Sequence, residues 1–230
     1  MARRTWRDDF VYGAGTFGTA ASATTPWRVT DTSAAGTPTY QAGVDNGTAA
    51  GIGHFARLGF SNTNEVQNVC LSFGDVLMFN IDDELVVDGR IRLGQSALDT
   101  ATSIVWGLAG DRNDVLDDVA QNLWFRMEGG TSTTAVYYES DDGTTDTNDT
   151  ATNLTLTTGW KNWRIDARDK SATRMFFTDA TGTMIPMGTT LNMSAYAGCL
   201  QPIVQIQKTA DTTTDYVDLD SFQVTWSESA

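Results

Sequence analysis

The chain has 230 residues, of which 29 are acidic and 15 are basic, so its formal net charge at pH 7 is −14. This length suits a single all-β domain, and the acidic excess argues against direct binding to nucleic acid, whose phosphates would repel it. The sequence has no run of 18 apolar residues, so we expect no membrane-spanning segment. The basic start of the chain is not followed by the apolar stretch of a secretory signal.

Residues 1–53 are rich in Gly, Ala and Thr, with isolated aromatic residues among them. Two interpretations remain open. These residues are either short strands and loops of the same sandwich as residues 54–230, in one continuous domain, or an extended arm that reaches a neighbouring subunit. The contacts of such an arm would be Trp6, Phe10, Tyr12 and Trp27.

The middle of the chain alternates between apolar and polar residues with a period of two, which indicates strands buried on one face. The clearest cases are residues 85–93 and 104–108, and residues 123–127 and 135–139 read as a hairpin across Gly129 and Gly130. Residues 113–121 are the one helix candidate, with Val115, Leu116 and Val119 as a short apolar stripe. We expect one or two helical turns there.

The last third of the chain continues this pattern after a polar segment. Residues 140–158 are mostly Asp, Thr, Gly and Asn, and we expect a long exposed loop. Residues 160–184 read as two strands and the start of a third, with Trp163 and Ile165 facing the core. In residues 216–226 the apolar positions change parity, which predicts a β-bulge near Asp220 and Ser221.

These strands and frequent turns predict an antiparallel β-sandwich. Its motifs resemble a concanavalin A-like or laminin G-like jelly roll, through three segments: residues 163–166, 174–177 and 216–222. Residues 6–10, with Trp27 and the Gly-rich stretch, are similar to structural proteins of tailed bacteriophages.

The phage resemblance implies a non-enzymatic virion protein, most simply a capsid decoration protein or a tail accessory protein. Its partners would be the major capsid protein or other virion proteins, and further copies of itself in a homo-oligomer. It would assemble in the host cytoplasm. The alternative function is a lectin-like module that binds carbohydrate through aromatic side chains on an open face, although the candidates suit a core equally. Those candidates are Trp106, Trp124, Tyr138 and Trp160.

Catalysis has little support in the sequence. The five glutamates are never close neighbours, whereas glycosidases use a pair of carboxyl groups flanking the scissile bond. The single histidine, His54, has no Ser or Cys nucleophile motif beside it. We therefore expect no catalytic residues and no enzyme.

Two further features leave alternatives open. A dense acidic group could bind calcium through carboxylate and carbonyl oxygens, or it could be a solvated loop, since it matches no defined calcium-loop pattern. Its members are Asp111, Asn113, Asp114, Asp117 and Asp118, with Asp141, Asp142 and Asp146 as a second group. No other cofactor is expected. Cys70 and Cys199 are either buried free thiols or a disulfide.

Overall fold

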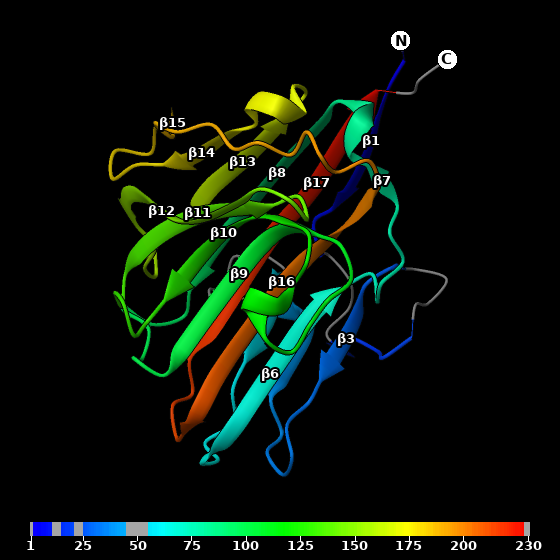
Figure 1. The fold of residues 1–230 in the computed structure, drawn as a ribbon. Helices are drawn as coiled ribbons and strands as arrows, with labels where there is room; N and C mark the ends of the chain where they lie inside the picture. Colours follow the sequence, from blue (N-terminus) through cyan, green and yellow to red (C-terminus); the bar gives the residue numbers. More distant parts are fainter. Residues whose placement is uncertain (1, 11–14, 21–24, 45–54, 228–230) are drawn as a thin grey trace.

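The alternating segments of the sequence pair into two antiparallel sheets that face each other across one core (Figure 1). The computed structural model describes residues 2–10, 15–20, 25–44 and 55–227. Sheet A runs from edge to edge through β15 (Met184–Pro186), β14 (Arg174–Thr178), β13 (Lys161–Ala167), β8 (Leu85–Leu93), β17 (Tyr216–Ser227), β5 (Phe55–Gly59), β4 (Thr39–Val44) and β2 (Gly15–Thr16), with β1 (Arg3–Asp8) also paired to β17.

Sheet B is the second layer. It runs through β12 (Asp146–Thr155), β11 (Ala135–Asp141), β10 (Asn122–Glu128), β9 (Thr102–Ala109), β16 (Cys199–Asp211), β6 (Glu65–Ser72) and β3 (Arg28–Asp31), with β7 (Phe79–Asn80) beside the start of β16. The helices in the described ranges are three single 3-10 turns: η1 (Ile81–Asp83), η2 (Leu116–Asp118) and η3 (Lys170–Ala172). The all-β jelly-roll sandwich expected from the sequence is therefore confirmed, including its small helical content.

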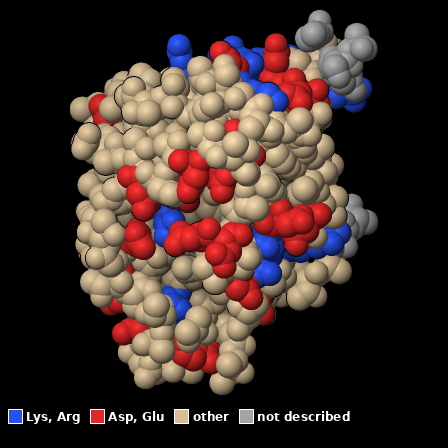
Figure 2. Space-filling model, viewed as in Figure 1, with Lys and Arg blue, Asp and Glu red and all other residues tan. Residues whose placement is uncertain are grey.

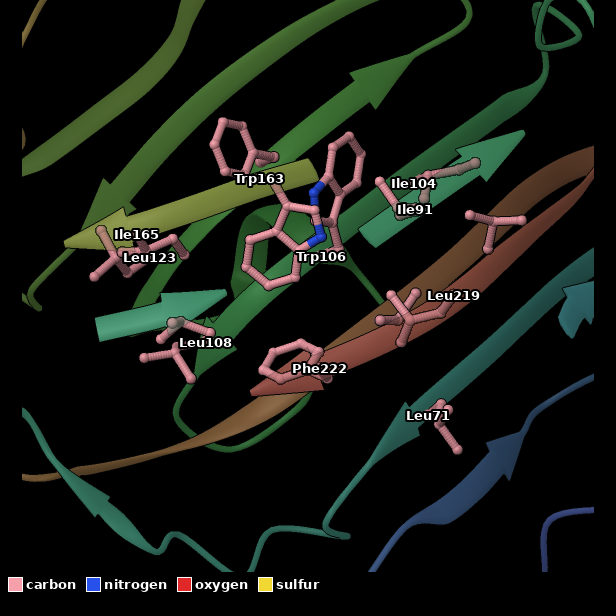
Figure 3. Packing of buried hydrophobic residues seen from close by; sticks show 14 of the residues in the cluster. Leu71, Ile91, Ile104, Trp106, Leu108, Leu123, Trp163, Ile165, Leu219 and Phe222 are labelled. Carbon is pink, nitrogen blue, oxygen red and sulfur yellow. The ribbon is translucent and has the colours of Figure 1, made fainter. Parts of the chain in front are cut away.

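Aromatic side chains from both sheets meet at the centre of the core (Figure 3). The indole of Trp163 packs edge-on against Phe222, with ring centroids 5.1 Å apart, and Trp106 stacks on Phe125 at 5.7 Å. All four are fully buried. A Cβ atom on Gly89 would lie 2.4 Å from the Trp163 ring, so this position in the middle of β8 must be glycine.

The β-bulge predicted in the last strand is present. Leu219 pairs with Ile91, but the next pair is Ser221 with Arg90, which leaves Asp220 as the extra residue. The bulge shifts the parity of the strand, so that the apolar residues before and after it all lie in the core. This part of the prediction is confirmed.

The long exposed loop expected over residues 140–158 is wrong, because most of it is the edge strand β12. Thr favours strands, and pairing with β11 satisfies main-chain groups on one side of the segment. The polar side chains that suggested a loop belong to an edge strand that is largely exposed. Its register shifts twice, and Asp149 and Asn153 adopt positive φ angles (43° and 60°) near these shifts.

The described residues of the N-terminal segment belong to the same sandwich and do not form an arm. Strand β1 pairs with β17 along its length, and Trp6 packs edge-on against Phe73 with ring centroids 5.1 Å apart. Phe10 and Trp27 are fully buried, and the Trp27 indole donates to Asp8 Oδ2 at 3.0 Å. The arm contacts proposed from the sequence are therefore wrong for these three aromatic residues, because Phe10 and Trp27 are buried in the chain's own core and the partly buried Trp6 packs against it. Tyr12 lies outside the described residues.

The two cysteines are free thiols and do not form a disulfide. Cys70 is buried as expected, whereas Cys199 is partly exposed. In the ranges that the structure describes, no helix has the length and apolar character needed to cross a membrane.

Candidate functional site

A short loop lies across the outer face of sheet B, the face that points away from the core. Residues 110–121 connect β9 to β10, and Leu116 and Val119 in this loop are buried. They complete a second apolar cluster, whose other members are Cys70, Val105, Ala109, Trp124 and Ile203. The helix expected here is a single 3-10 turn, and Val115, which the sequence placed in the apolar stripe, is 50% exposed.

Amide side chains on the outer face of sheet B hold the loop in place. Asn68 Nδ2 donates to the main-chain carbonyl of Asp114 at 2.8 Å, and Gln205 Nε2 donates to that of Asn113 at 2.8 Å. Buried polar groups need such partners, so these bonds favour one position of the loop. That position sets Asp117 beside β10.

Arg126 on β10 is the centre of a charged cluster beside this loop. Its Nη1 lies 2.5 Å from Asp117 Oδ1 and 3.5 Å from Glu139 Oε2. Its Nη2 lies 3.6 Å from Glu128 Oε1, and its Nε lies 3.9 Å from Asp149 Oδ1. Four carboxyl groups, from one loop and three strands, thus surround a single guanidinium, and negative charge is in excess.

A hollow with a volume of about 410 Å³ opens at this cluster. We call it the Arg126 basin and define it by its lining residues: Asp117, Arg126, Glu128, Asp146, Asn148 and Asp149. Figure 2 shows acidic side chains gathered around a few basic atoms in the middle of this face. The basin therefore presents several carboxylate acceptors, one amide and one guanidinium.

The cluster has a buried floor and an exposed rim. The side chains of Arg126 and Glu139 are only 6% and 4% exposed, and Glu139 also accepts a hydrogen bond from the Trp124 indole. On the rim, the side chains of Asp117 and Asp149 are 70% and 44% exposed. The floor fixes the geometry, and the rim is the part most exposed to solvent.

Burial controls protonation at the floor. It raises the pKa of Glu139, and the carboxylates of Asp149 and Asp117 raise it further, against the lowering effect of Arg126. Burial also raises the pKa of Asp149, and the charges of Glu128 and Asp117 raise it further, against the lowering effect of Arg126. Burial acts to lower the pKa of Arg126, but its hydrogen bond with Asp117 and the charge of Glu139 leave that pKa raised. Arg126 therefore stays charged at neutral pH.

The calcium ligands proposed from the sequence are not brought together as a set. Asp114 forms an ion pair with Arg112, and Asp117 forms one with Arg126. Among the described residues, no group of three or more His, Cys, Asp and Glu side chains has an arrangement that could hold a metal ion. The structure therefore does not assemble the proposed calcium ligands into one site. These ligands were Asp111, Asn113, Asp114, Asp117 and Asp118.

Three of the four aromatic residues proposed for glycan stacking are in the wrong place for it. Trp106, Trp124 and Tyr138 are at most 1% exposed, so their ring faces are packed inside the protein. Trp160 is partly exposed, but the guanidinium of Arg92 lies 4.5 Å from its ring centroid. Trp160 thus remains the one candidate of this kind with access to solvent.

Sequence reasoning did not find the Arg126 basin. Its residues lie far apart in the chain and meet only because β12 and the loop containing η2 flank β10 and β11. One local signal was available. Phe125 and Met127 lie on one face of the strand, and Trp124 and Arg126 lie on the other. A charged residue therefore shares a strand face with a large apolar one. His54, the histidine considered for catalysis, lies outside the described residues.

No protein-family model and no curated protein sequence matches this chain. Solved structures do resemble it. A protein of unknown function from Shewanella oneidensis MR-1 has a TM-score of 0.62 at 12% identity, with 97% of this chain and 86% of that chain covered. The carbohydrate recognition domain of Emp47p has a TM-score of 0.57 at 11% identity, with 88% and 89% covered. Peanut lectin has a TM-score of 0.57 at 7% identity, with 98% and 97% covered.

Other similar structures include a potassium-bound form of the Emp46p carbohydrate recognition domain and a few glycanases or glucanase-like proteins. At these identities the likeness shows the fold, which is the lectin-like, concanavalin A-like jelly roll. None of the structures named here points to a phage origin.

Proposed function

We propose that this chain is a carbohydrate-binding module of the lectin type and that the Arg126 basin is its sugar site. The fold is shared with carbohydrate recognition domains. The basin supplies the second requirement, which is a hollow with a few fixed polar groups that can orient a ligand. Carboxylate oxygens of Asp117, Asp149 and Glu128 would accept hydrogen bonds from sugar hydroxyls, and Asn148 can both donate and accept.

The observation that carries this proposal is an unpaired donor at the basin floor. Arg126 Nε is buried and has no hydrogen-bond partner within the described part of the chain. Leaving a buried donor unpaired costs about 1 to 3 kcal/mol. A ligand hydroxyl that accepted a hydrogen bond from this donor, between Arg126 and Asp149, would remove that cost. This gain would contribute to binding at a side chain whose position is already fixed.

The chemistry of the basin also limits the affinity. No aromatic side chain lines it, so a bound sugar would lack the stacking contact that buries its apolar face. Hydrogen bonds exchanged with water contribute about 0.5 to 1.5 kcal/mol each. We therefore expect dissociation constants on the order of 0.1 to 1 mM for a mono- or disaccharide.

A glycan array followed by calorimetric titration with the best oligosaccharide tests the proposal. Two variants remove basin groups, Asp117→Asn and Asn148→Ala. Each has a matched exposed control outside the basin, Asp118→Asn and Asn64→Ala. The basin variants should lower the affinity about fivefold or more, and the controls should stay within twofold. Equal effects of a variant and its control, or no glycan binding at all, would refute the assignment.

Glycan cleavage is a second candidate, favoured by one observation. Asp149 combines a raised pKa with a half-exposed side chain beside other carboxyl groups, which is the arrangement of a general acid. Glu139 does not suit this role, because it is buried against Arg126 and Trp124. Release of reducing ends from a bound oligosaccharide, lost in Asp149→Asn, would support cleavage. Unchanged oligosaccharide after prolonged incubation supports binding alone.

The virion role stays a prediction of the sequence resemblance. The same holds for its capsid partners, its homo-oligomeric state and its location in the particle. A sugar-binding module on a phage surface would be compatible with both the virion role and the carbohydrate proposal. Finding this chain in purified virions would therefore not contradict the basin assignment. Loss of glycan binding in the basin variants is the result on which the carbohydrate proposal depends.

A further inference from the structure

The outer face of sheet A, on the opposite side of the sandwich from the Arg126 basin, carries a row of three adjoining hollows. Their volumes are about 300, 210 and 370 Å³. The first and second share Asp166 and Arg168, and the second and third share Asp88 and Gln223. Shared walls make them one continuous groove across β14, β13, β8, β17 and β1. We call this groove the arginine trough after six of its lining residues: Arg3, Arg7, Arg90, Arg164, Arg168 and Arg174.

The strand pattern explains why arginines gather on this face. In β8 and β13 the core-facing apolar residues alternate with Arg90 and Arg164. In β1, Trp6 faces the core, so Arg3 and Arg7 share the outer face while Arg4 takes the other one. The trough therefore follows from period-two alternation across adjacent strands.

The trough is locally positive on an acidic protein. Six arginines and four aspartates line it, and Asp9 outside the lining forms an ion pair with Arg7, which leaves an excess of one positive charge, whereas the whole chain has a net charge of −14. Three of these aspartates form ion pairs with arginines of the trough, and the charge of the fourth, Asp169, interacts with Arg174 without an ion pair. Arg164 Nε lies 2.6 Å from Asp88, Arg168 Nη2 lies 2.5 Å from Asp166, and Arg90 is paired with Asp220 at 3.2 Å.

Two arginines of the trough are available to a ligand. Arg3 and Arg174 are exposed, and neither forms an ion pair with a carboxylate in the described ranges. Arg174 lines the first hollow and Arg3 lines the second. Arginine binds carboxylate and sulfate groups through two parallel hydrogen bonds, so each position suits one anionic group.

We propose that the arginine trough binds a linear anionic polysaccharide, with carboxylate or sulfate groups at Arg3 and Arg174. A row of connected hollows matches an extended chain with repeated charges. The polar groups between the arginines, such as Gln223 and Asn162, can bind the intervening hydroxyls. The trough lacks the apolar centre of a protein interface, because it has few apolar lining residues and no exposed large hydrophobic residue. This site lies on the other sheet from the basin and does not depend on it.

Calorimetric titration of the full chain tests this proposal with three oligosaccharide probes of equal length. They are a sulfated heparin fragment, a carboxylated polygalacturonate fragment and neutral dextran. At 50 mM NaCl we expect binding to at least one of the two anionic probes but not to dextran. The affinity should fall as salt rises, because exposed charges are screened. Replacing both free arginines, in Arg3→Gln with Arg174→Gln, should weaken binding about tenfold.

Arg4→Gln is the matched control, because it removes the same charge from the same strand on the opposite face. It should change the affinity less than twofold. The proposal is overturned if neither anionic probe binds, or if Arg4→Gln weakens binding as much as the double variant does. It is also overturned if free sulfate competes as well as the saccharide at equal sulfate concentration, since the site would then hold a simple anion.

One further outcome would reassign the trough to a protein partner. The exposed rim of the Arg126 basin is acidic, so a second copy of this chain could supply the anionic groups. If the polysaccharide is the occupant, the double arginine variant and Asp117→Asn should leave the sedimentation of the chain at low salt unchanged. Self-association that disappears in both the double arginine variant and Asp117→Asn would overturn the proposal in favour of contact between copies. Because Asp117→Asn leaves the trough intact, failure of the basin and failure of the trough are distinguishable.

Discussion

Lys208 offers the sharpest stability prediction, because its charged side chain is almost completely buried (1% exposed) at one end of the core. Its Nζ carries three N–H donors and lies within hydrogen-bonding distance of four main-chain carbonyls, so at least one N–H is shared between two of them. These carbonyls belong to Ser61 at 2.9 Å, Thr63 at 3.0 Å, Asp211 at 2.8 Å and Thr213 at 3.1 Å. Ser61 and Thr63 lie in the loop between β5 and β6, Asp211 is the last residue of β16, and Thr213 lies in the loop that follows it. One ammonium group therefore ties both loops to the end of the sandwich.

The magnitude follows from these contacts. Hydrogen bonds to a charged group contribute about 1.5 to 3 kcal/mol each, and the cost of burying the ammonium cancels part of their sum. Lys208→Met keeps the chain length of the side chain but removes the donor, which leaves four carbonyls without their partner. We expect a loss of about 3 to 5 kcal/mol in the free energy of unfolding, which is in the range measured when one partner of a buried charged contact is removed.

Urea unfolding of the wild type and the variant measures this loss through the midpoint and the slope. Lys161→Met is the control, because Lys161 Nζ donates to a single carbonyl, that of Asp179, at 2.6 Å. It should cost about 1 kcal/mol. A loss below about 1 kcal/mol for Lys208→Met, or one equal to the control, would refute the reasoning. In Lys208→Ala, ammonium chloride should restore part of the lost stability, whereas choline chloride at the same ionic strength should not.

Three other predictions concern the buried groups. Arg126→Met should lower the free energy of unfolding by about 3 to 5 kcal/mol at pH 7, measured in urea, and by less at pH 4, where the surrounding carboxyl groups begin to protonate. The pKa of Glu139 is raised in the folded chain. At pH values between the unfolded pKa and this raised pKa, the folded state therefore binds more protons than the unfolded state. The contribution of Glu139 to the free energy of unfolding thus falls as pH rises through this window. The stability of Glu139→Gln relative to the wild type should therefore increase as pH rises from 4.5 to 7. A stability difference between the two proteins that does not change with pH would contradict this prediction. Burial raises the pKa of Cys70 to about 12, so at pH 8 a disulfide reagent should modify only the partly exposed Cys199 in the native chain and both thiols after unfolding; rapid modification of native Cys70 would contradict the burial argument.

The strand pattern of the fold could be predicted because alternation is a local property. The change of parity between Leu219 and Phe222 alone located the bulge at Asp220, since both residues had to reach the same core. Residues 140–158 show where this reasoning fails. An edge strand that is mostly exposed has no apolar face, so β12 could not be distinguished from a loop without knowing that β11 would pair with it.

The candidate site depends on long-range pairing, which the sequence does not show. Glu139 approaches Arg126 only because β10 and β11 pair, and Asp149 joins them only because β12 is the next strand. Aromatic residues were misleading for a related reason. Trp106 and Trp124 lie on adjacent strands but on opposite faces of sheet B. Trp106 is buried in the main core, and Trp124 is buried under the loop that contains η2.

The most direct test of the sugar site is nuclear magnetic resonance of the isotope-labelled chain, titrated with the best oligosaccharide from the array. The side-chain Nε–H of Arg126 and the side-chain amide of Asn148 report on the floor and the rim of the basin. We predict that both signals shift in proportion to occupancy, while the indole signal of Trp160, the residue before β13 of sheet A, stays unchanged. Saturable binding that moves Trp160 and leaves Arg126 and Asn148 in place would contradict the account.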